Sequence, residues 1–173
     1  MIKSIVLAID GSEPAKHAQN LAIDMASRYE ASLTLVHVLI HDHPSSEFTH
    51  MAEVEDLLES NKPEVRGKED TYKAIARFLG SENDEKEAKV IVLIGEQLLK
   101  NASKSASQAS VANVTTEIRS GDYANCILEV AKKADADIIV MGRRGLSKLK
   151  GFVTGSVSHK VSQRAECSVL TVK

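Results

Sequence analysis

The sequence predicts an α/β fold built on one mostly parallel, five-stranded sheet. Apolar runs of strand length occupy residues 5–9 and 33–38, and the segment between them repeats apolar residues at helical spacing. Such a strand–helix–strand unit imposes parallel pairing with a right-handed crossover. Further strand-like segments follow at 114–118, 138–141 and 168–172, separated from one another by helical patterns. Alternation of this kind indicates a sheet covered by helices.

The first helix is expected to begin after Asp10-Gly11-Ser12, which interrupts the first apolar run. Ser12 is a suitable N-cap, and Pro14 falls in the first turn, where a helix tolerates proline. One face of this helix should pack against the sheet. The residues that recur at helical spacing along that face are Ala15, Ala18, Ala22, Met25 and Tyr29.

The middle of the chain has the least regular pattern. We interpret residues 40–87 as a helical insertion within a single domain that spans residues 1–173. The charged segment 81–87 predicts an exposed turn or loop. Residues 90–94 fit a strand as well as a helix, but the apolar spacing continues beyond them, so we favour one long helix. Its inward positions are Ile91, Ile94, Leu98, Ala102 and Ala106.

The last sixty residues return to clear patterns. Residues 114–118 alternate between apolar and polar types, as an edge strand does. A helix is predicted over 123–133, and Val157 and Val161 mark a shorter one after the fourth strand. The apolar segment at 168–172 supplies the fifth strand.

Composition limits the classes of function. With 173 residues, 43% of them hydrophobic and 27% charged, the chain has material for one α/β core. No window approaches the roughly 20 apolar residues of a membrane span, and the first apolar run is too short for a signal peptide, so we expect a cytoplasmic protein. A net charge of -2 excludes a generally basic nucleic-acid binder. Cys126 and Cys167 are expected to be thiols rather than a disulfide.

The stretch that says most about function follows the fourth predicted strand. It reads Gly142-x2-Gly145-x9-Gly155-Ser156, with a helix expected at its end. Glycines let a backbone approach an anion closely, and a helix N-terminus presents free N–H groups to it. From Gly142 to Ala165 the chain carries six Lys or Arg and no acidic residue. The sequence therefore predicts a phosphate site here, whereas the P-loop and dinucleotide-binding motifs are absent.

Other interpretations stay open at this stage. Gly142 and Gly145 could simply turn the chain after a strand, and Asp10 could cap the first helix together with Ser12. A dense group of histidines, with Asp42 among them, also suggests a metal site, although His37 is expected inside a strand and the others lack the spacing that aims two rings at one ion. The remaining members of that group are His41, His43 and His50.

Four features together resemble the universal stress protein family. They are Asp10-Gly11-Ser12 after the first strand, His37-Val38 ending the second, Met141-Gly142 ending the fourth, and the glycine spacing described above. The similarity runs from Ile2 to about Val38 and from about Val114 to Val172, and the glycine pattern is that of the subgroup that binds ATP. The resemblance implies a Rossmann-like, three-layer α/β/α fold, similar to the adenine nucleotide α-hydrolases, with strand order 3-2-1-4-5. It also implies a homodimer paired through the last strand.

The resemblance further implies which residues hold the nucleotide. Ala8 and Asp10 would border the adenine and the ribose, and Val38 would pack on the base. Met141 and Gly142 would contact the nucleoside. The phosphates would be held, chiefly by main-chain N–H groups and two hydroxyls, at Gly145, Gly155, Ser156, Val157 and Ser158.

Asp10 needs a partner, because a carboxylate repels phosphate. We expect either a Mg²⁺ or Mn²⁺ ion that bridges Asp10 to the phosphates, or a hydrogen bond from the sugar to this carboxylate. No catalytic set accompanies it, so we interpret the protein as an ATP-binding module for stress response or signalling, with at most slow ATPase or autokinase activity. The alternatives are an interaction scaffold that uses the acidic 47–87 segment, and an enzyme of the α-hydrolase type, from whose motif Asp10-Gly11-Ser12-Glu13 departs.

Overall fold

The computed structural model of the chain describes residues 1–39, 84–145 and 155–173. The chain falls into two compact units, one made of Met1–Val38 and Gly95–Lys173 and the other of Leu39–Ile94. The predicted insertion at 40–87 lies outside the described residues, apart from its last four positions. The first unit contains the whole sheet and all the predicted site residues.

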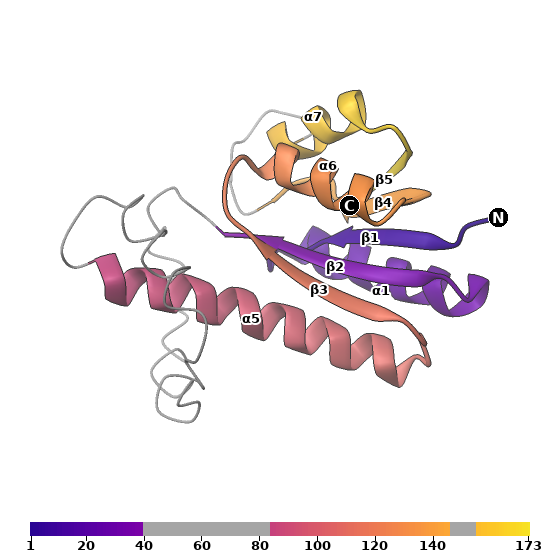
Figure 1. Cartoon of the computed structure of the whole chain (residues 1–173), viewed down its shortest axis with the longest axis horizontal. Helices are drawn as coiled ribbons and strands as arrows, with labels where there is room; N and C mark the ends of the chain where they lie inside the picture. The colour runs from indigo at the N-terminus through magenta and orange to yellow at the C-terminus, as the bar shows by residue number, and fades with distance from the viewer. Residues whose placement is uncertain (40–83, 146–154) are drawn as a thin grey trace. The chain divides into compact units, whose positions relative to one another are not determined.

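The sheet has five strands in the order β3-β2-β1-β4-β5, and every neighbouring pair is parallel (Figure 1). This confirms the α/β class and the strand order. Because β1 lies between β2 and β4, the carboxyl ends of these three strands meet at one edge of the sheet. The strands are β1 Ser4–Ala8, β2 Ser32–Val38, β3 Val114–Arg119, β4 Ile138–Gly142 and β5 Ser168–Val172.

Four helices belong to the described chain, namely α1 Glu13–Tyr29, α5 Asp84–Gln108, α6 Tyr123–Lys133 and α7 Ser156–Arg164. The long α5 confirms that residues 90–94 are helical. It also begins within the predicted loop at 81–87, so that prediction was wrong for its last four residues. Acidic side chains are favourable near a helix N-terminus, which accounts for a helical start in this charged segment.

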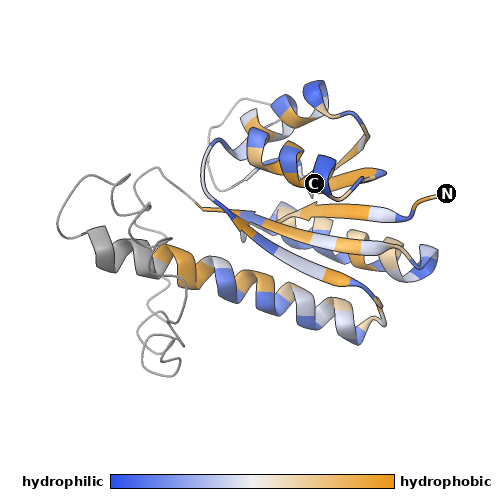
Figure 2. Cartoon of the chain, in the orientation of Figure 1, coloured by the Kyte–Doolittle hydropathy of each residue, from blue (hydrophilic) through white to orange (hydrophobic). Residues whose placement is uncertain are grey.

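Helices α1, α6 and α7 and the 95–108 part of α5 form the outer layers on the two faces of the sheet (Figure 1). One buried cluster joins alternate strand residues to α1 and to the 95–108 part of α5, and a second joins the opposite strand residues to α6 and α7. In Figure 2, β1 and β2 are accordingly apolar along much of their length, as strands covered on both faces are, whereas the edge strand β3 is more polar. The fully buried strand residues include Ile5, Val6, Leu7, Leu33, Leu35, Ile139 and Val140.

The inward face of α1 differs from the predicted one at its end. Tyr29 is 52% exposed, whereas Ile23 and Ala26 are buried. Tyr29 is the last residue of the helix, and Glu30 follows it with a left-handed φ of 52°. A helical stripe therefore stops contacting the sheet where the helix ends.

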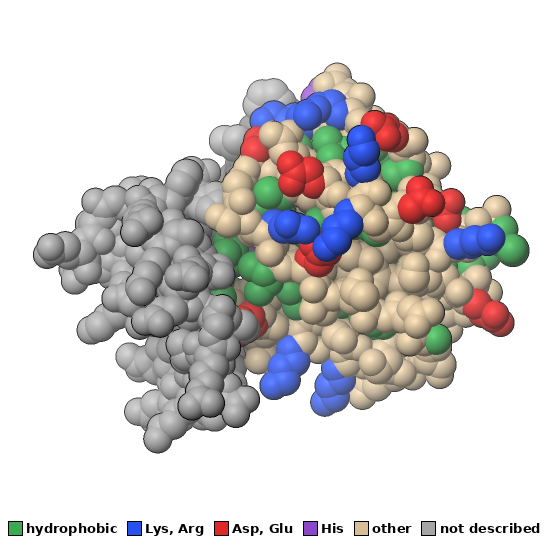
Figure 3. All heavy atoms as spheres, in the orientation of Figure 1, with side chains coloured by type: hydrophobic (Ala, Val, Ile, Leu, Met, Phe, Trp, Pro, Cys, Tyr) green, Lys and Arg blue, Asp and Glu red, His purple; other side chains and the backbone are tan. Residues whose placement is uncertain are grey.

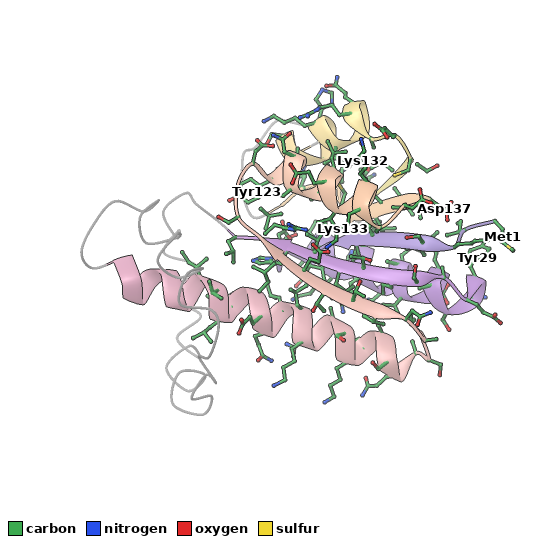
Figure 4. The ribbon with its side chains drawn as sticks, viewed as in Figure 1. Met1, Tyr29, Tyr123, Lys132, Lys133 and Asp137 are labelled. Carbon is green, nitrogen blue, oxygen red and sulfur yellow. The ribbon has the colours of Figure 1, made fainter. Side chains whose placement is uncertain are left out.

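Asp137 ties the amino ends of β1 and β4 together. Its Oδ2 accepts hydrogen bonds from the N–H groups of Lys3 at 2.6 Å and Ser4 at 3.0 Å, which lowers the pKa of this carboxyl. Figure 4 shows Asp137 at the end of the sheet where Met1 lies, while Tyr123, which begins α6, lies at the opposite end. The carboxyl edge beside Tyr123 is therefore the place to look for a site.

Two further expectations concern the whole chain. Both Cys126 and Cys167 are free thiols, and burial raises the pKa of each. Among the described helices none combines the length and the apolar character needed to cross a bilayer.

Candidate functional site

The site is built where β1 and β4 end side by side. Ala8 is the register partner of Met141, so Asp10, two residues after β1, and Gly142, the last residue of β4, lie at the same edge. The strands are neighbours, and the loop after each of them contacts the other.

The turn from β1 into α1 is held by Asp10. Its Oδ1 accepts hydrogen bonds from the Ser12 N–H at 2.9 Å and from the Ser12 hydroxyl at 2.6 Å. Gly11 lies between them with a φ of 85°, a conformation in which glycine is favoured. The Ser12 Oγ in turn accepts from the Ala15 N–H at 3.3 Å and caps α1, as predicted. Asp10 thus supports the helix cap through one carboxylate oxygen.

The other oxygen of the Asp10 carboxylate, Oδ2, lies against Gly145. Gly145 belongs to the segment 142–155 that carries the glycine motif, which we call the glycine loop. A Cβ on Gly145 would be 2.6 Å from Oδ2, closer than any real side chain approaches. The backbone of Gly145 therefore occupies the space directly over the Asp10 carboxylate. A side chain at this position would displace one of the two.

Gly142 has a different reason to be glycine. A Cβ there would lie 2.9 Å from the Ala15 nitrogen and 3.0 Å from the Pro14 carbonyl carbon, which are backbone atoms of the first turn of α1. The end of β4 thus packs directly on the start of α1. The first glycine of the motif brings the helix and the strand together, in addition to any contact with a ligand.

The end of the loop returns to the end of β4. The Gly155 N–H donates to the Arg143 carbonyl at 2.9 Å, and the Ser158 hydroxyl donates to the same oxygen at 2.7 Å. Ser158 is 2% exposed, and the Arg143 N–H donates to the Val172 carbonyl at 2.6 Å. Two groups that were predicted to bind phosphate, the Gly155 N–H and the Ser158 hydroxyl, therefore have partners within the protein.

The N-terminus of α7 has no side-chain cap at its N-cap residue. Gly155 is the N-cap and offers no side chain, whereas Ser12 caps α1 and Asp122 caps α6 with side-chain oxygens. The N–H groups of the first turn of a helix have no partner within the helix, and they carry its positive end. In α7 the residues of that turn are Ser156, Val157 and Ser158.

The predicted nucleoside contacts lie at strand ends on the sheet face covered by α6 and α7. Val38 ends β2 and is 7% exposed, Met141 is 5% exposed, and Ala8 is half-buried beside both of their strands. All three pack with the same buried cluster. They form the apolar wall of the edge whose polar members are Asp10 and Ser12.

His37 is a further member of this edge, which sequence analysis considered as a metal ligand and as part of the family resemblance. It lies within β2, as predicted, and its Nδ1 donates to the Ile9 carbonyl at 2.7 Å. Burial lowers the pKa of the imidazole below its ordinary 6.5, while the Ile9 bond and the Asp10 charge oppose that shift. A histidine in a largely buried strand, one residue from its end, is the signal that could have identified it.

The metal-site interpretation of the histidines has no support in the described residues. His41, Asp42, His43 and His50 lie outside them, and no group of three His, Cys, Asp or Glu within them could hold an ion.

Two basic residues of α7 contact residues at the start of α6. Lys160 lies 3.6 Å from Asp122, and Arg164 donates to Asn125 at 2.7 Å, so both rest against α6. The Arg143 Nε is buried without a hydrogen-bond partner among the described residues. On the face drawn in Figure 3, Lys and Arg side chains are interspersed with Asp and Glu over the described residues.

Comparison with known proteins gives one consistent family. The profile of the Universal stress protein family matches residues 1–173. Universal stress protein YxiE of Bacillus subtilis is 31% identical over 175 residues, with 100% of both chains covered.

Solved structures agree in fold. The universal stress protein UspA from Lactobacillus plantarum has a TM-score of 0.70 at 19% identity, covering 99% of this chain and 98% of its own. A universal stress protein in complex with cAMP has a TM-score of 0.62 at 22% identity, covering 99% and 97%. A family member from Arabidopsis thaliana with AMP bound has a TM-score of 0.55 at 20% identity, covering 99% and 91%. At these identities the likeness shows the fold alone.

Proposed function

The chain belongs to the universal stress protein family, and on that premise we propose that it binds an adenine nucleotide, ATP in the first place, at the carboxyl edge between β1 and β4. The observation that carries the proposal is the start of α7. It begins at a glycine without a side-chain cap, beside the ends of β4 and of the glycine loop. The complexes of structural relatives with cAMP and with AMP support the choice of an adenine nucleotide.

The phosphates would lie at the start of α7. The N–H groups of Ser156 and Val157 and the Ser156 hydroxyl are the donors we assign to them, with the main chain of Gly145 alongside. Gly155 and Ser158 would support the site without contacting the phosphates, because their hydrogen bonds to the Arg143 carbonyl fix the direction of the α7 N-terminus. The helix dipole adds an attraction for anions of about 0.3–1 kcal/mol.

The nucleoside would lie across the ends of β1, β2 and β4. Val38 is assigned to the base, Ala8 and Asp10 to the border of adenine and ribose, and Met141 and Gly142 to the nucleoside as a whole. An apolar wall with a few polar groups is the usual composition of such a site. The Asp10 carboxylate accepts hydrogen bonds, which suits a ribose hydroxyl.

A divalent cation fits the same carboxylate. Oδ1 of Asp10 is occupied by Ser12, whereas Oδ2 faces the loop that would hold the phosphates. Mg²⁺ is commonly held by one or two carboxylates together with the phosphates of a nucleotide. We therefore propose Mg²⁺ or Mn²⁺ at Asp10, where the ion would offset the repulsion between carboxylate and phosphate.

The biological role we propose is that of a cytoplasmic stress-response or signalling module of one domain. Asp10 is the one carboxylate among the described residues that we assign to the site, so we expect at most slow ATPase or autokinase activity. We also propose a homodimer through β5. That strand is an edge of the sheet, and its apolar residues are only half-buried in the single chain.

The test is calorimetric titration of ATP with Mg²⁺ into the wild type and two variants at Gly155. In Gly155→Asp the new carboxylate reaches the N–H groups of the first turn of α7, where Asp is a preferred N-cap, and excludes phosphate. We expect an affinity at least about 100-fold weaker, which corresponds to roughly 2.7 kcal/mol.

Gly155→Ala is the matched control. Both variants add a Cβ that lies 3.0 Å from the Arg143 carbonyl oxygen, but alanine brings no carboxylate. Its affinity should fall by less than about tenfold, and circular dichroism should show both variants folded. Equal affinities for the Asp variant and the wild type would refute the phosphate site at α7.

A further inference from the structure

A buried imidazole lies beside the proposed nucleotide site without being assigned to it. His37 is 3% exposed and its Nδ1 is 2.7 Å from the Ile9 carbonyl oxygen. A carbonyl oxygen only accepts, so Nδ1 must carry a proton. Burial keeps the ring neutral at pH 7 by lowering its pKa, and the neutral ring is therefore the tautomer with a bare Nε2.

The position does not require histidine for packing. Leu33 and Leu35 precede His37 on the same face of β2, and both are fully buried in the cluster formed with α1 and α5. A third leucine would continue that pattern, and a buried polar ring is unfavourable unless its hydrogen bonds are made. The bond to Ile9 is what the histidine supplies in place of a further apolar contact.

That bond fixes the first peptide group after β1. The Ile9 N–H donates to the Val36 carbonyl at 2.9 Å, and the Ile9 carbonyl accepts from His37, so both polar groups of Ile9 are held by β2. The peptide group between Ile9 and Asp10 is planar. The donor on the Ile9 oxygen therefore also sets the direction of the Asp10 N–H and the place of the Asp10 Cα.

The Asp10 side chain is short, so its carboxylate follows its Cα. Oδ1 must reach the N–H and hydroxyl of Ser12 at 2.9 and 2.6 Å, and Oδ2 must lie against the backbone of Gly145. A rotation of the Ile9–Asp10 peptide would disturb both arrangements. The chain of contacts thus runs from β2 through the end of β1 to the glycine loop.

We propose that His37 is a positioning residue of the nucleotide site, acting through the Ile9–Asp10 peptide to hold the Asp10 carboxylate where ribose or a phosphate-bound cation meets it. The inference rests on the proposed nucleotide binding and extends it to a residue that touches no ligand. The proposal leads to a specific prediction. A residue that acts only through Asp10 has no effect on ATP affinity once the Asp10 carboxylate has been removed.

The experiment is a double-mutant cycle read by calorimetry with ATP and Mg²⁺. His37→Leu removes the donor and keeps the bulk, His37→Asn keeps an N–H near the place of Nδ1, and Asp10→Asn removes the charge. We expect His37→Leu to weaken binding about tenfold in the wild-type background and to add nothing to Asp10→Asn. His37→Asn should recover most of the affinity.

A stability control separates positioning from general loosening. Leu33→Val lies in the same strand at its amino end, and Leu33→Ala is the stronger version, so one of them can be matched to the melting temperature of His37→Leu. The matched variant should bind ATP as the wild type does.

The outcomes are distinguishable. If the wild type binds ATP but His37→Leu weakens binding equally in both Asp10 backgrounds, or not at all, His37 is not a positioning residue and the proposed function stands. The same conclusion follows if the Leu33 control loses as much affinity as His37→Leu. A wild type that binds neither ATP nor AMP would overturn the proposed function, and this inference with it.

Discussion

Single residues at the carboxyl edge of the sheet have structural roles in addition to the roles in nucleotide binding that we propose for them. Asp10 supports the cap of α1 with one carboxylate oxygen and presents the other to Gly145. Sequence analysis left capping and ligand binding open for Asp10, and the geometry shows the capping contact through Oδ1, while ligand binding stays a proposal. The two roles would use different atoms of one side chain.

The pH dependence of stability is a prediction at this scale. The pKa of His37 is lowered in the folded protein from the ordinary 6.5, so below pH 6.5 the unfolded chain binds a proton that the folded chain does not. The contribution of His37 to the free energy of unfolding is fully present above pH 6.5, and it is lost as the pH falls through the pKa of His37 in the folded protein. One proton of difference corresponds to about 1.4 kcal/mol per pH unit.

Urea unfolding at pH 7.5 and pH 5.5 measures this effect. The free energy of unfolding of the wild type should decrease between the two values, and that of His37→Asn should decrease less. If both proteins lose the same free energy in this interval, the buried imidazole is not the group responsible.

The residues predicted from the sequence differ in how well the local pattern determined them. Ser12 was identifiable as an N-cap because its neighbours Gly11 and Pro14 mark a helix start. The partners of Gly155 and Ser158 were not, since both groups bond to the Arg143 carbonyl, and that contact depends on the path of a loop. His37 was missed as a structural donor because its partner, Ile9, comes directly after a different strand, β1.

At the scale of elements, packing between β4 and α1 gives the edge its form. The first turn of α1 lies so close to Gly142 that no Cβ fits between them. Helix and strand therefore meet backbone to backbone, and the Asp10–Ser12 turn and the glycine loop are brought within contact of each other.

Replacement of Gly142 by alanine tests that packing. The new Cβ meets backbone atoms of Pro14 and Ala15, which cannot rotate away, so we expect a loss of about 1–3 kcal/mol in the free energy of unfolding. Gly145→Ala is the comparison, because its Cβ meets the end of the Asp10 side chain instead. Urea denaturation should rank Gly142→Ala as clearly the less stable; the reverse order would contradict the close packing.

Elements with a strong hydrophobic period were predictable, and their ends were not. The spacing from Ile91 to Ala106 distinguished a helix from a strand because it persisted for several turns beyond the ambiguous residues. The helix α5 begins at Asp84, inside the segment 81–87 that was predicted to be a loop. The sequence could not distinguish the two, since charged residues suit both an exposed loop and the first turn of a helix. The prediction that Tyr29 faces the sheet was wrong for a related reason, because hydrophobic periodicity does not indicate where a helix stops contacting the sheet.

At the scale of the whole molecule, the strand order decides where a ligand could bind. The order β3-β2-β1-β4-β5 puts the reversal of winding between β1 and β4, and ligands of such sheets lie beyond the carboxyl ends of the strands at that point. Alternating strands and helices predicted the parallel sheet, whereas the order came from the family resemblance. A pattern along one chain indicates its elements but not which strands become neighbours.

The most direct test of the account is an amide NMR titration of the ¹⁵N-labelled protein with ATP and Mg²⁺, which reports binding and its location together. We expect the largest shifts at the ends of β1 and β4 and at the start of α7, with the amino edge around Asp137 unchanged. The amides concerned are those of Asp10, Gly142, Gly145, Ser156 and Val157. Saturating ATP that leaves these amides unmoved, or moves a different surface, would contradict the account.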